Sequence, residues 1–174
     1  SSAASDVYKR QEVASAGGYL SYENIADKAT VAGVEVEVRK NLFVRPLSSA
    51  ANGMNKLSFG LNGSYIYTNA KMPLATVTTG SQLEGAAPWI ANFDLSHNFT
   101  KGTHSFINTL VFNYVSDKIY TIGTQGYQDI MEQGMMTLDF VSQAKLNKYV
   151  SLTLKARNLL NPSYQLSRKA NESG

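Results

Sequence analysis

Cysteine is absent from the 174 residues of this chain, and tryptophan occurs only once. Without cysteine there is no disulfide, no thiolate nucleophile and no cysteine-ligated zinc site. No stretch of about 18 apolar residues occurs either, so the sequence predicts no transmembrane helix. The first residues lack the apolar segment of a signal peptide. The chain must therefore use its hydrophobic residues in short segments.

Neither sign of charge dominates. The chain has 16 Lys and Arg against 13 Asp and Glu, a formal net charge of +3. The basic residues are scattered through expected turns and strand ends, so we predict no nucleic-acid partner. What the chain does have is 43% hydrophobic residues, with 10 Tyr and 7 Phe, beside only 17% charged residues. That composition suits strands with one apolar face and one face that contacts water.

From Thr30 onward the hydrophobic residues recur with a period of two, which is typical of strands. Val34, Val36 and Val38 alternate with charged residues, and Leu57 to Tyr67 and Trp89 to Leu95 alternate in the same way. Counted with a strand before Glu23, the pattern predicts about seven antiparallel strands. The predicted fold is all-β, an up-and-down meander of long strands.

The expected connections alternate between short and long. Thr100 to Thr103 and Asn147-Lys148 are predicted tight turns, whereas Ala70 to Ala87 and Asp117 to Gln133 are predicted long excursions. In a meander, alternate connections lie at opposite ends, so one rim has tight turns and the other has large loops. Transmembrane barrels show this asymmetry, and about 9 to 11 tilted residues suffice to span a bilayer.

Aromatic residues gather near the ends of the expected strands, where they would form two interfacial girdles. They are Tyr65, Tyr67, Trp89, Phe99, Phe106, Tyr114 and Tyr149. About seven strands do not close a barrel, and open sheet edges are not tolerated in hydrocarbon. We therefore expect a partial, unclosed barrel wall, with Leu154 to Gln165 as a strand that enters a long loop and whose returning strand is missing.

The start of the chain has a different character. Asp6 to Gln11 resembles the translation of an adaptor used in preparing sequencing libraries. We accordingly expect residues 1–11 to be a non-native tail and residues 12–174 to be the natural protein. The alternative is an ordinary polar tail.

Several ordered segments resemble a known family. They are "ATVAGVEVEVRKNL" at 29–42, "LEGAAPWIANFDLSHNF" at 83–99, "FNYVSDKIYTIGTQGYQDI" at 112–130 and "TLDFVSQAKLNKYVSLTLKARNLLNPSYQ" at 137–165. Together they resemble the C-terminal barrel of TonB-dependent outer-membrane receptors of the Bacteroidetes type. The most specific part runs from Ala156 to Tyr164, which resembles the "NLLN-P-Y" segment before the last strand of that family.

The resemblance implies an outer-membrane protein of a Gram-negative bacterium, with a barrel of about 22 strands around an N-terminal plug. In that family the extracellular loops bind a substrate, which is then imported with the help of TonB. The implied partners are outer-membrane lipid, TonB through the plug region, a surface lipoprotein, and a small-molecule, glycan or peptide substrate. The plug and the final strand are expected to lie outside residues 12–174, and no cofactor is implied.

The large loops are where we expect any ligand contact, because binding residues gather on loops held by a rigid scaffold. The second excursion combines aromatic rings with amide and carboxylate groups that suit sugars, peptides or chelates. The candidates are Asp117, Tyr120, Gln125, Tyr127 and Gln128.

Other polar residues favour structural roles. His97 and His104 flank a predicted turn, but no third ligand lies at a suitable spacing, so we predict no metal site. Glu35, Glu37 and Arg39 share one strand face, where a site in the lumen is the alternative to a polar wall with cross-strand pairs. No G-x-S-x-G or comparable arrangement occurs, so we predict no catalytic residue.

Two further hypotheses come from other classes of protein. A soluble or surface β-sandwich binding module would have shorter strands and a second sheet packed on the apolar face. An outer-membrane barrel enzyme would need Ser, His and a carboxylate that converge near one rim.

Overall fold

The computed structural model describes residues 9–12, 20–23, 28–47, 53–71, 82–123 and 128–168. Every regular element in these ranges is a strand. Among the described residues there is thus no helix that is long and apolar enough to cross a membrane. Six strands form the main sheet: β3 (Lys28–Pro46), β4 (Met54–Lys71), β5 (Trp89–Lys101), β6 (His104–Val115), β9 (Met135–Lys145) and β10 (Ser151–Ala156). The predicted all-β fold is confirmed.

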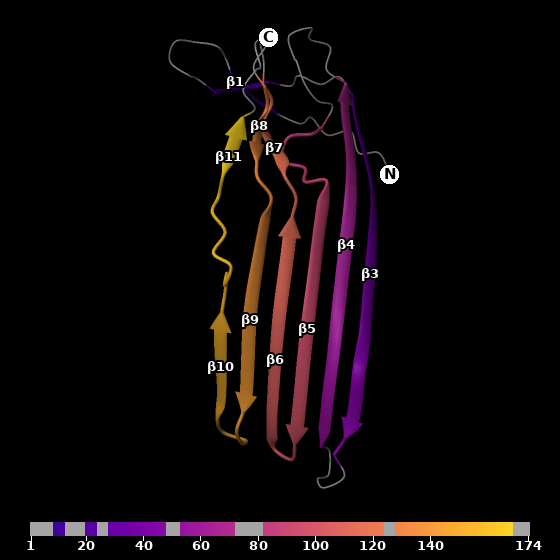
Figure 1. The fold of residues 1–174 in the computed structure, drawn as a ribbon, viewed down its shortest axis with the longest axis vertical. Coiled ribbons are helices and arrows are strands. Elements are labelled where there is room, and N and C mark those ends of the chain that lie inside the picture. The colour runs from indigo at the N-terminus through magenta and orange to yellow at the C-terminus, as the bar shows by residue number, and fades with distance from the viewer. Residues whose placement is uncertain are drawn as a thin grey trace.

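The main sheet has the order β10-β9-β6-β5-β4-β3, and every neighbouring pair is antiparallel. Figure 1 shows the six strands side by side in a single layer, with the chain passing up and down between neighbours. β3 and β10 are the edges, so the sheet is an unclosed meander. It is the architecture expected for a section of a barrel wall.

Strand lengths differ from the prediction at one side of the sheet. β3 has 19 residues and β4 has 18, longer than the roughly 9 to 11 tilted residues that span a bilayer. Their pairing runs without interruption from Lys28↔Lys71 to Pro46↔Met54 except for one irregularity between Asn41 and Phe43. That irregularity shifts the alternation by one residue, so Phe43 and Arg45 lie on the same side of the sheet as Val38 and Lys40, and Val44 lies on the other side.

Most strands of the main sheet place apolar side chains on one face and polar side chains on the other, because successive residues point to opposite faces. β6 is mixed, since Ile107 and Val111 lie on the same face as Asp94. The register aligns the apolar residues: Val38, Leu61, Phe93, Phe112 and Leu138 form one row across five strands. We call this side the apolar face, and the side with Glu35, Glu37, Asp94 and Asp139 the polar face.

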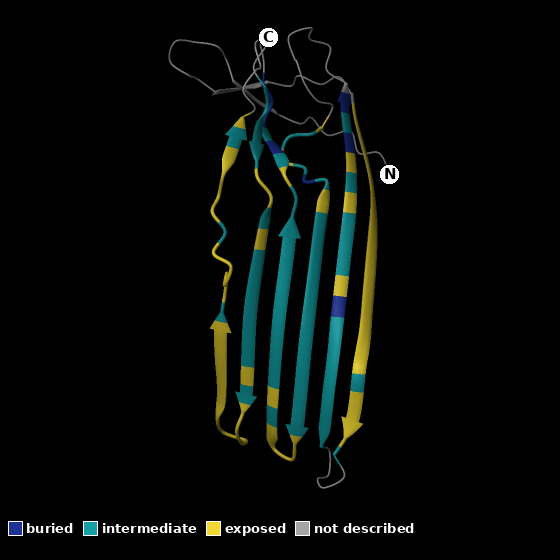
Figure 2. Ribbon diagram, viewed as in Figure 1, coloured by how far each residue is buried: buried dark blue, intermediate teal, exposed yellow. Residues whose placement is uncertain are grey.

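The apolar face has no second layer on it in the described part of the chain. Val34 is 61% exposed, Val36 60% and Leu61 47%. Figure 2 shows the middle strands as intermediate and the edge strands β3 and β10 as mainly exposed. A β-sandwich would bury these residues against another sheet, so the structure does not have that fold.

The small buried core lies at the end with the long connections. There β7 (Lys118–Thr121), β8 (Ile130–Glu132) and β11 (Leu166–Arg168) form a sheet in the order β11-β8-β7. Ile119 and Ile122 are buried, and Met131 packs against them. This cluster sits above the main sheet in Figure 1.

The described connections alternate as predicted, but the second long one contains strands. The tight turns at residues 102–103 and 146–150 lie at the lower end of Figure 1, and β4 and β6 both end at the upper end, where the long excursions begin. Within the predicted excursion from Asp117 to Gln133 the short strands β7 and β8 form, which the sequence pattern did not predict. Short strands of three or four residues fall below what alternation can show.

One other expectation was wrong in detail. The strand before Glu23 exists as β2 (Leu20–Glu23), but it pairs with β1 (Lys9–Glu12) outside the main sheet. The strand expected to enter a long loop ends at Ala156, and the chain resumes strand pairing at β11, also outside the main sheet. The main sheet therefore has six strands where about seven were expected.

Candidate functional site

The polar face is the first part of the candidate site. Across β3, β4 and β5 its side chains form a hydrogen-bonded row, in which Asn62 Nδ2 donates to Glu35 Oε1 at 2.6 Å. Asn92 Nδ2 in turn donates to Asn62 Oδ1 at 3.4 Å. Such cross-strand pairs contribute roughly 0.2 to 1 kcal/mol each.

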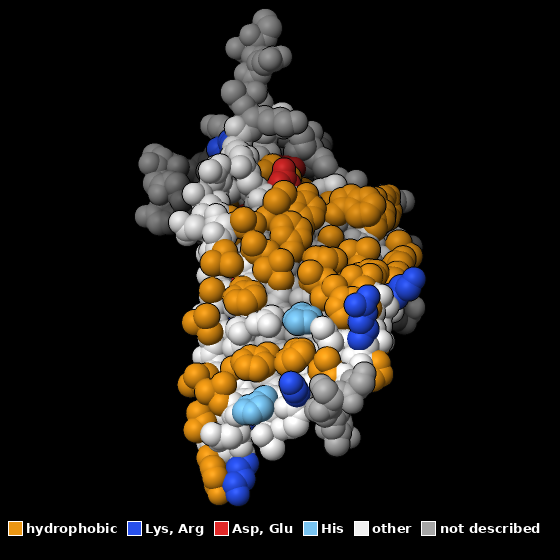
Figure 3. Space-filling model, turned by 60° about the horizontal axis from the view of Figure 1, so that its bottom comes forward, with side chains coloured by type: hydrophobic (Ala, Val, Ile, Leu, Met, Phe, Trp, Pro, Cys, Tyr) orange, Lys and Arg blue, Asp and Glu red, His pale blue; other side chains and the backbone are white. Residues whose placement is uncertain are grey.

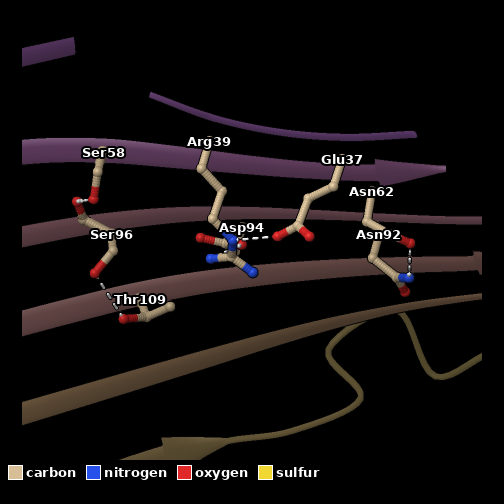
Figure 4. Close-up of polar contacts among 8 residues, drawn as sticks. All are labelled: Glu37, Arg39, Ser58, Asn62, Asn92, Asp94, Ser96 and Thr109. Carbon is tan, nitrogen blue, oxygen red and sulfur yellow. Dashed lines mark hydrogen bonds and ion pairs between the residues drawn. The ribbon is translucent and has the colours of Figure 1, made fainter. Parts of the chain in front are cut away.

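A charged cluster lies beside this row. Arg39 donates through Nε to Glu37 Oε1, and its Nη1 lies 3.8 Å from Asp94 Oδ1. Gly60 makes room for the Asp94 carboxylate, because a β-carbon on Gly60 would collide with it. The Arg39 and Glu37 side chains are 69% and 52% exposed, so water screens these pairs and they add little to stability. Figure 4 shows the three charged groups pointing toward one another.

Hydroxyl and amide groups continue the polar face across the sheet. Ser58 Oγ donates to the Ser96 carbonyl at 3.5 Å, and the Ser96 and Thr109 hydroxyls lie 3.2 Å apart. Asn113 Nδ2 donates to Thr137 Oγ1 at 3.1 Å between β6 and β9. Across β3, β4 and β5 the face is thus a polar wall with cross-strand pairs, the structural role predicted for Glu35, Glu37 and Arg39. Apolar residues such as Val111 and Val141 interrupt it on β6 and β9.

A cavity of about 250 Å³ opens where the polar face meets the long connections. Asn113 and Thr137 line it from the sheet, and Lys118, Glu132 and Gln133 line it from the connection. Lys118 Nζ pairs with Glu132 Oε1 at 3.0 Å, with side chains 27% and 16% exposed. This ion pair is more shielded from water than the two pairs of Arg39.

Tyr164 connects the segment before β11 to the same ion pair. Its hydroxyl donates to Glu132 Oε2 at 3.5 Å. Partial desolvation, and then the neighbouring Glu132 carboxylate, raise the pKa of Tyr164, so the hydroxyl keeps its proton and remains a donor. The charged pair and the tyrosine together tie β7, β8 and β11 into one rim.

The predicted ligand residues are distributed through this rim. Asp117 is exposed, and its Oδ1 accepts a hydrogen bond from the Gly134 N–H at 2.5 Å, which holds the two ends of the excursion together. Tyr120 lies in β7 and Gln128 lies before β8, both half-buried. Gln125 and Tyr127 lie outside the described residues. Contact of these five residues with a ligand stays a prediction.

Sequence reasoning missed Lys118, Glu132 and Tyr164. The opposite charges near the two ends of the excursion could have predicted an ion pair, since Lys118 and Glu132 are direct partners in the β7–β8 register. The sequence pattern did not show that register because β7 and β8 are so short.

The two histidines lie on the apolar face. His97 Nε2 is 2.8 Å from Asn55 Oδ1, and His104 pairs with Lys101 beside the tight turn. No group of three His, Cys, Asp or Glu side chains that could hold a metal occurs among the described residues. The carboxylates of the main sheet all lie on the polar face, so the sheet separates them from both histidines. This arrangement does not offer the converging triad that a barrel enzyme needs.

A one-layer antiparallel wall with one apolar and one polar face points to a barrel, and comparison with protein families decides which kind. The family model described as "TonB dependent receptor-like, beta-barrel" matches residues 5–159. The chain belongs to this family. No curated protein and no solved structure matches the chain. Membership supports a receptor-type function of the outer membrane.

The family match begins within residues 1–11, the segment that we expect to be adaptor-derived. Neither the match nor the pairing of β1 with β2 tests whether that segment is natural, so the expected division into residues 1–11 and 12–174 stays a prediction.

The "ARNLLNPSY" segment of this receptor-like barrel has a structural role. The Asn158 N–H donates to Asp139 Oδ1 at 2.8 Å, and the Leu159 N–H donates to the Leu138 carbonyl at 2.8 Å. Asn158 and Asn161 both have left-handed backbone angles, with φ of 54° and 44°. Asparagine tolerates that conformation better than other side chains do, apart from glycine. The segment thus ends β10 and directs the chain toward β11.

Proposed function

We propose that this chain forms part of the wall of an outer-membrane receptor that imports its substrate with energy supplied through TonB. The strands of the main sheet cross the outer membrane, with the apolar face toward acyl chains and the polar face toward the lumen. The observation that carries this proposal is the division of six paired strands into one exposed apolar face and one hydrogen-bonded polar face. A single exposed apolar layer is stable only against lipid or a further protein layer.

The spacing of aromatic residues on the apolar face supports a membrane crossing. Tyr65 and Trp89 pack at 4.5 Å between ring centroids at one end, and Phe99 and Phe106 pack at 6.5 Å at the other. Trp89 and Phe99 lie ten positions apart on β5, which is about 34 Å at about 3.4 Å per residue. A strand tilt of about 40° reduces this to about 26 Å, and transmembrane barrels have an apolar band about 25 Å tall between their aromatic girdles.

The asymmetry of the connections supports an orientation. Transmembrane barrels have short turns in the periplasm and longer loops outside the cell. The rim with the cavity and the Lys118–Glu132 pair therefore faces the exterior. We propose that it captures the substrate, a small molecule, glycan or peptide, through residues such as Asp117, Tyr120 and Gln128. Further strands and a plug complete the lumen, and the plug region contacts TonB. A surface lipoprotein is a further proposed partner.

The orientation can be tested by labelling single cysteines, because none of the 174 residues is a cysteine. Gln133→Cys places a thiol at the exposed long-connection rim, and Tyr149→Cys places one at the tight turn after β9. In intact cells that express the full-length protein, a membrane-impermeant maleimide should label Gln133→Cys only. Tyr149→Cys should react after the outer membrane is permeabilised. Equal labelling of both variants in intact cells would contradict the proposed orientation.

Import requires a separate test. A strain that lacks the gene should lose growth on one member of a panel of iron chelates, cobalamin, glycans and peptides as sole sources. A strain that lacks TonB should show the same loss, and the gene returned in trans should restore growth only where TonB is present. Growth that depends on the gene but not on TonB would refute coupled import and leave a passive barrel.

A further inference from the structure

The lower end of the apolar face differs from the rest of it. Across β5, β6 and β9, the row below Leu95, Leu110 and Phe140 consists of His97, Asn108 and Ser142. The next row contains Phe99 and Phe106, and the last positions beside the tight turn are Lys101 and His104. From the middle of the sheet to the turn, the side chains thus change from apolar to neutral polar, then aromatic, then basic.

The polar side chains in the row with His97 form hydrogen bonds with their neighbours. His97 Nε2 lies 2.8 Å from Asn55 Oδ1, and Ser142 Oγ donates to Asn108 Oδ1 at 2.7 Å. Polar groups that face an apolar medium are costly unless they are hydrogen-bonded. Paired in this way, they are suited to the depth at which hydrocarbon gives way to the polar part of a lipid.

The last positions of the strands, beside the tight turns, carry basic side chains. We call Arg45, Lys101, His104 and Lys148 the basic outer rim; all four are exposed. Arg45 and Lys101 lie on the apolar face at the ends of β3 and β5, and Lys148 lies in the turn between β9 and β10. The Arg45 guanidinium is 5.6 Å from the centre of the Phe43 ring, and Lys148 Nζ is 4.7 Å from that of Tyr149.

No carboxylate offsets the charges of Arg45, Lys101 and Lys148 on the apolar face of the described strands. Every Asp and Glu of the main sheet belongs to the polar face: Glu35, Glu37, Asp94 and Asp139. Figure 3 shows hydrophobic side chains over this surface, with most of the visible Lys, Arg and His side chains in its middle and lower parts and the visible acidic side chains near the top. The rim is therefore a band of positive charge directly next to an apolar surface.

We propose that the basic outer rim binds the phosphate groups of anionic phospholipids in the leaflet beside the tight turns. The order of the rows matches the order of groups in a phospholipid, which passes from acyl chain through ester to phosphate. Cations above an aromatic ring keep their donors free for a phosphate while their stems stay in the interface. This inference rests on the membrane orientation proposed above and adds a preference for one class of lipid.

The expected size of the preference for anionic lipid follows from the distance between the cations of the basic outer rim. Neighbouring strands lie about 4.8 Å apart, and Arg45 of β3 and Lys101 of β5 are two strands apart, at about 10 Å. One lipid phosphate therefore contacts about one of these cations. A basic residue near an anionic surface contributes about a fivefold preference, which added salt reduces.

The test uses the full-length receptor in phosphatidylcholine vesicles that contain spin-labelled phosphatidylglycerol or spin-labelled phosphatidylcholine. The fraction of each label immobilised by the protein gives their relative association. We expect about a fivefold preference for phosphatidylglycerol in the wild-type protein at low salt. The triple variant Arg45→Ala, Lys101→Ala, Lys148→Ala should lower it to about one.

A matched control removes the same number of charges from the same part of the sheet. Lys56, Lys145 and Lys155 lie on the polar face, so their triple alanine variant should keep the full preference. If the rim variant does not insert, Lys101→Gln alone, which keeps most of the side chain, should still lower the preference measurably. An unselective wild-type protein, or an equal decrease in both triple variants, would overturn the inference while the proposed function stands. A wild-type protein that does not insert into vesicles would overturn both.

Discussion

An arginine in place of Leu61 tests whether the apolar face touches hydrocarbon. Leu61 lies in β4 between Val38 of β3 and Phe93 of β5, and it is 47% exposed. The midpoint between the aromatic residues Trp89 and Phe99 is position 94 of β5, next to Phe93. Leu61 is therefore within about 3 Å of the proposed bilayer midplane.

The expected cost depends on depth. Arginine on the lipid face of a barrel costs about 2 to 4 kcal/mol at the midplane and about 0 to 1 kcal/mol near the interfaces. Leu57 pairs with His97, three positions below the midpoint, which places it about 8 Å from the midplane at a tilt of about 40°. Leu57→Arg should therefore cost clearly less than Leu61→Arg. Asn62→Arg, one position from Leu61 but beside the Glu35 carboxylate on the polar face, should cost least.

The measurement is the folding of the full-length receptor into phosphatidylcholine vesicles at a series of urea concentrations. Gel mobility without heating separates folded from unfolded protein. The folded-to-unfolded ratio of Leu61→Arg should fall by about 30-fold to 1,000-fold relative to wild type, the equivalent of about 2 to 4 kcal/mol. Equal ratios for Leu61→Arg and Asn62→Arg would refute the assignment of the faces. A cost without dependence on depth would indicate a protein partner in place of lipid.

Three further predictions concern the long connections, at Gly134, Asn158 and Glu132. Gly134→Ala places a β-carbon 2.7 Å from a backbone oxygen and 3.0 Å from Asp117 Oδ1, so it should destabilise the protein by about 1 to 3 kcal/mol, measured as a lower urea midpoint. Asn158→Ala should cost about 1 kcal/mol in the same assay and Asn158→Gly less, because the backbone there has a φ of 54°. Glu132→Gln removes the pair with Lys118 and should speed amide hydrogen exchange in β8 by up to about fivefold, an effect that disappears at high salt.

The sequence determined the strands of the main sheet. Alternation at Leu57 to Tyr67 and Trp89 to Leu95 predicted both the strands and the residues that share their apolar face, because a one-residue shift would turn every side chain to the wrong face. The tight turn at Gly102, where φ is 61°, and the turn at Asn147 were also predicted. Local backbone chemistry is sufficient for such features.

The sequence pattern did not predict which residues of distant segments pair with each other. Alternation places Glu35 and Asn62 on polar faces, but only the register of β3 with β4 brings their side chains within 2.6 Å. Likewise, β7 and β8 are too short to show a period, and their pairing sets Lys118 against Glu132. A pattern along one strand carries no information about which residue lies opposite on the next.

The same division applies to the molecule as a whole. By itself, the sequence determined that this is a meander with one apolar and one polar face, because side-chain direction follows position along each strand. Only the tertiary structure decided that the apolar face is uncovered in the described part of the chain and that β7, β8 and β11 gather around Glu132. These features depend on contacts between residues far apart in the chain, which form only when the strands are paired.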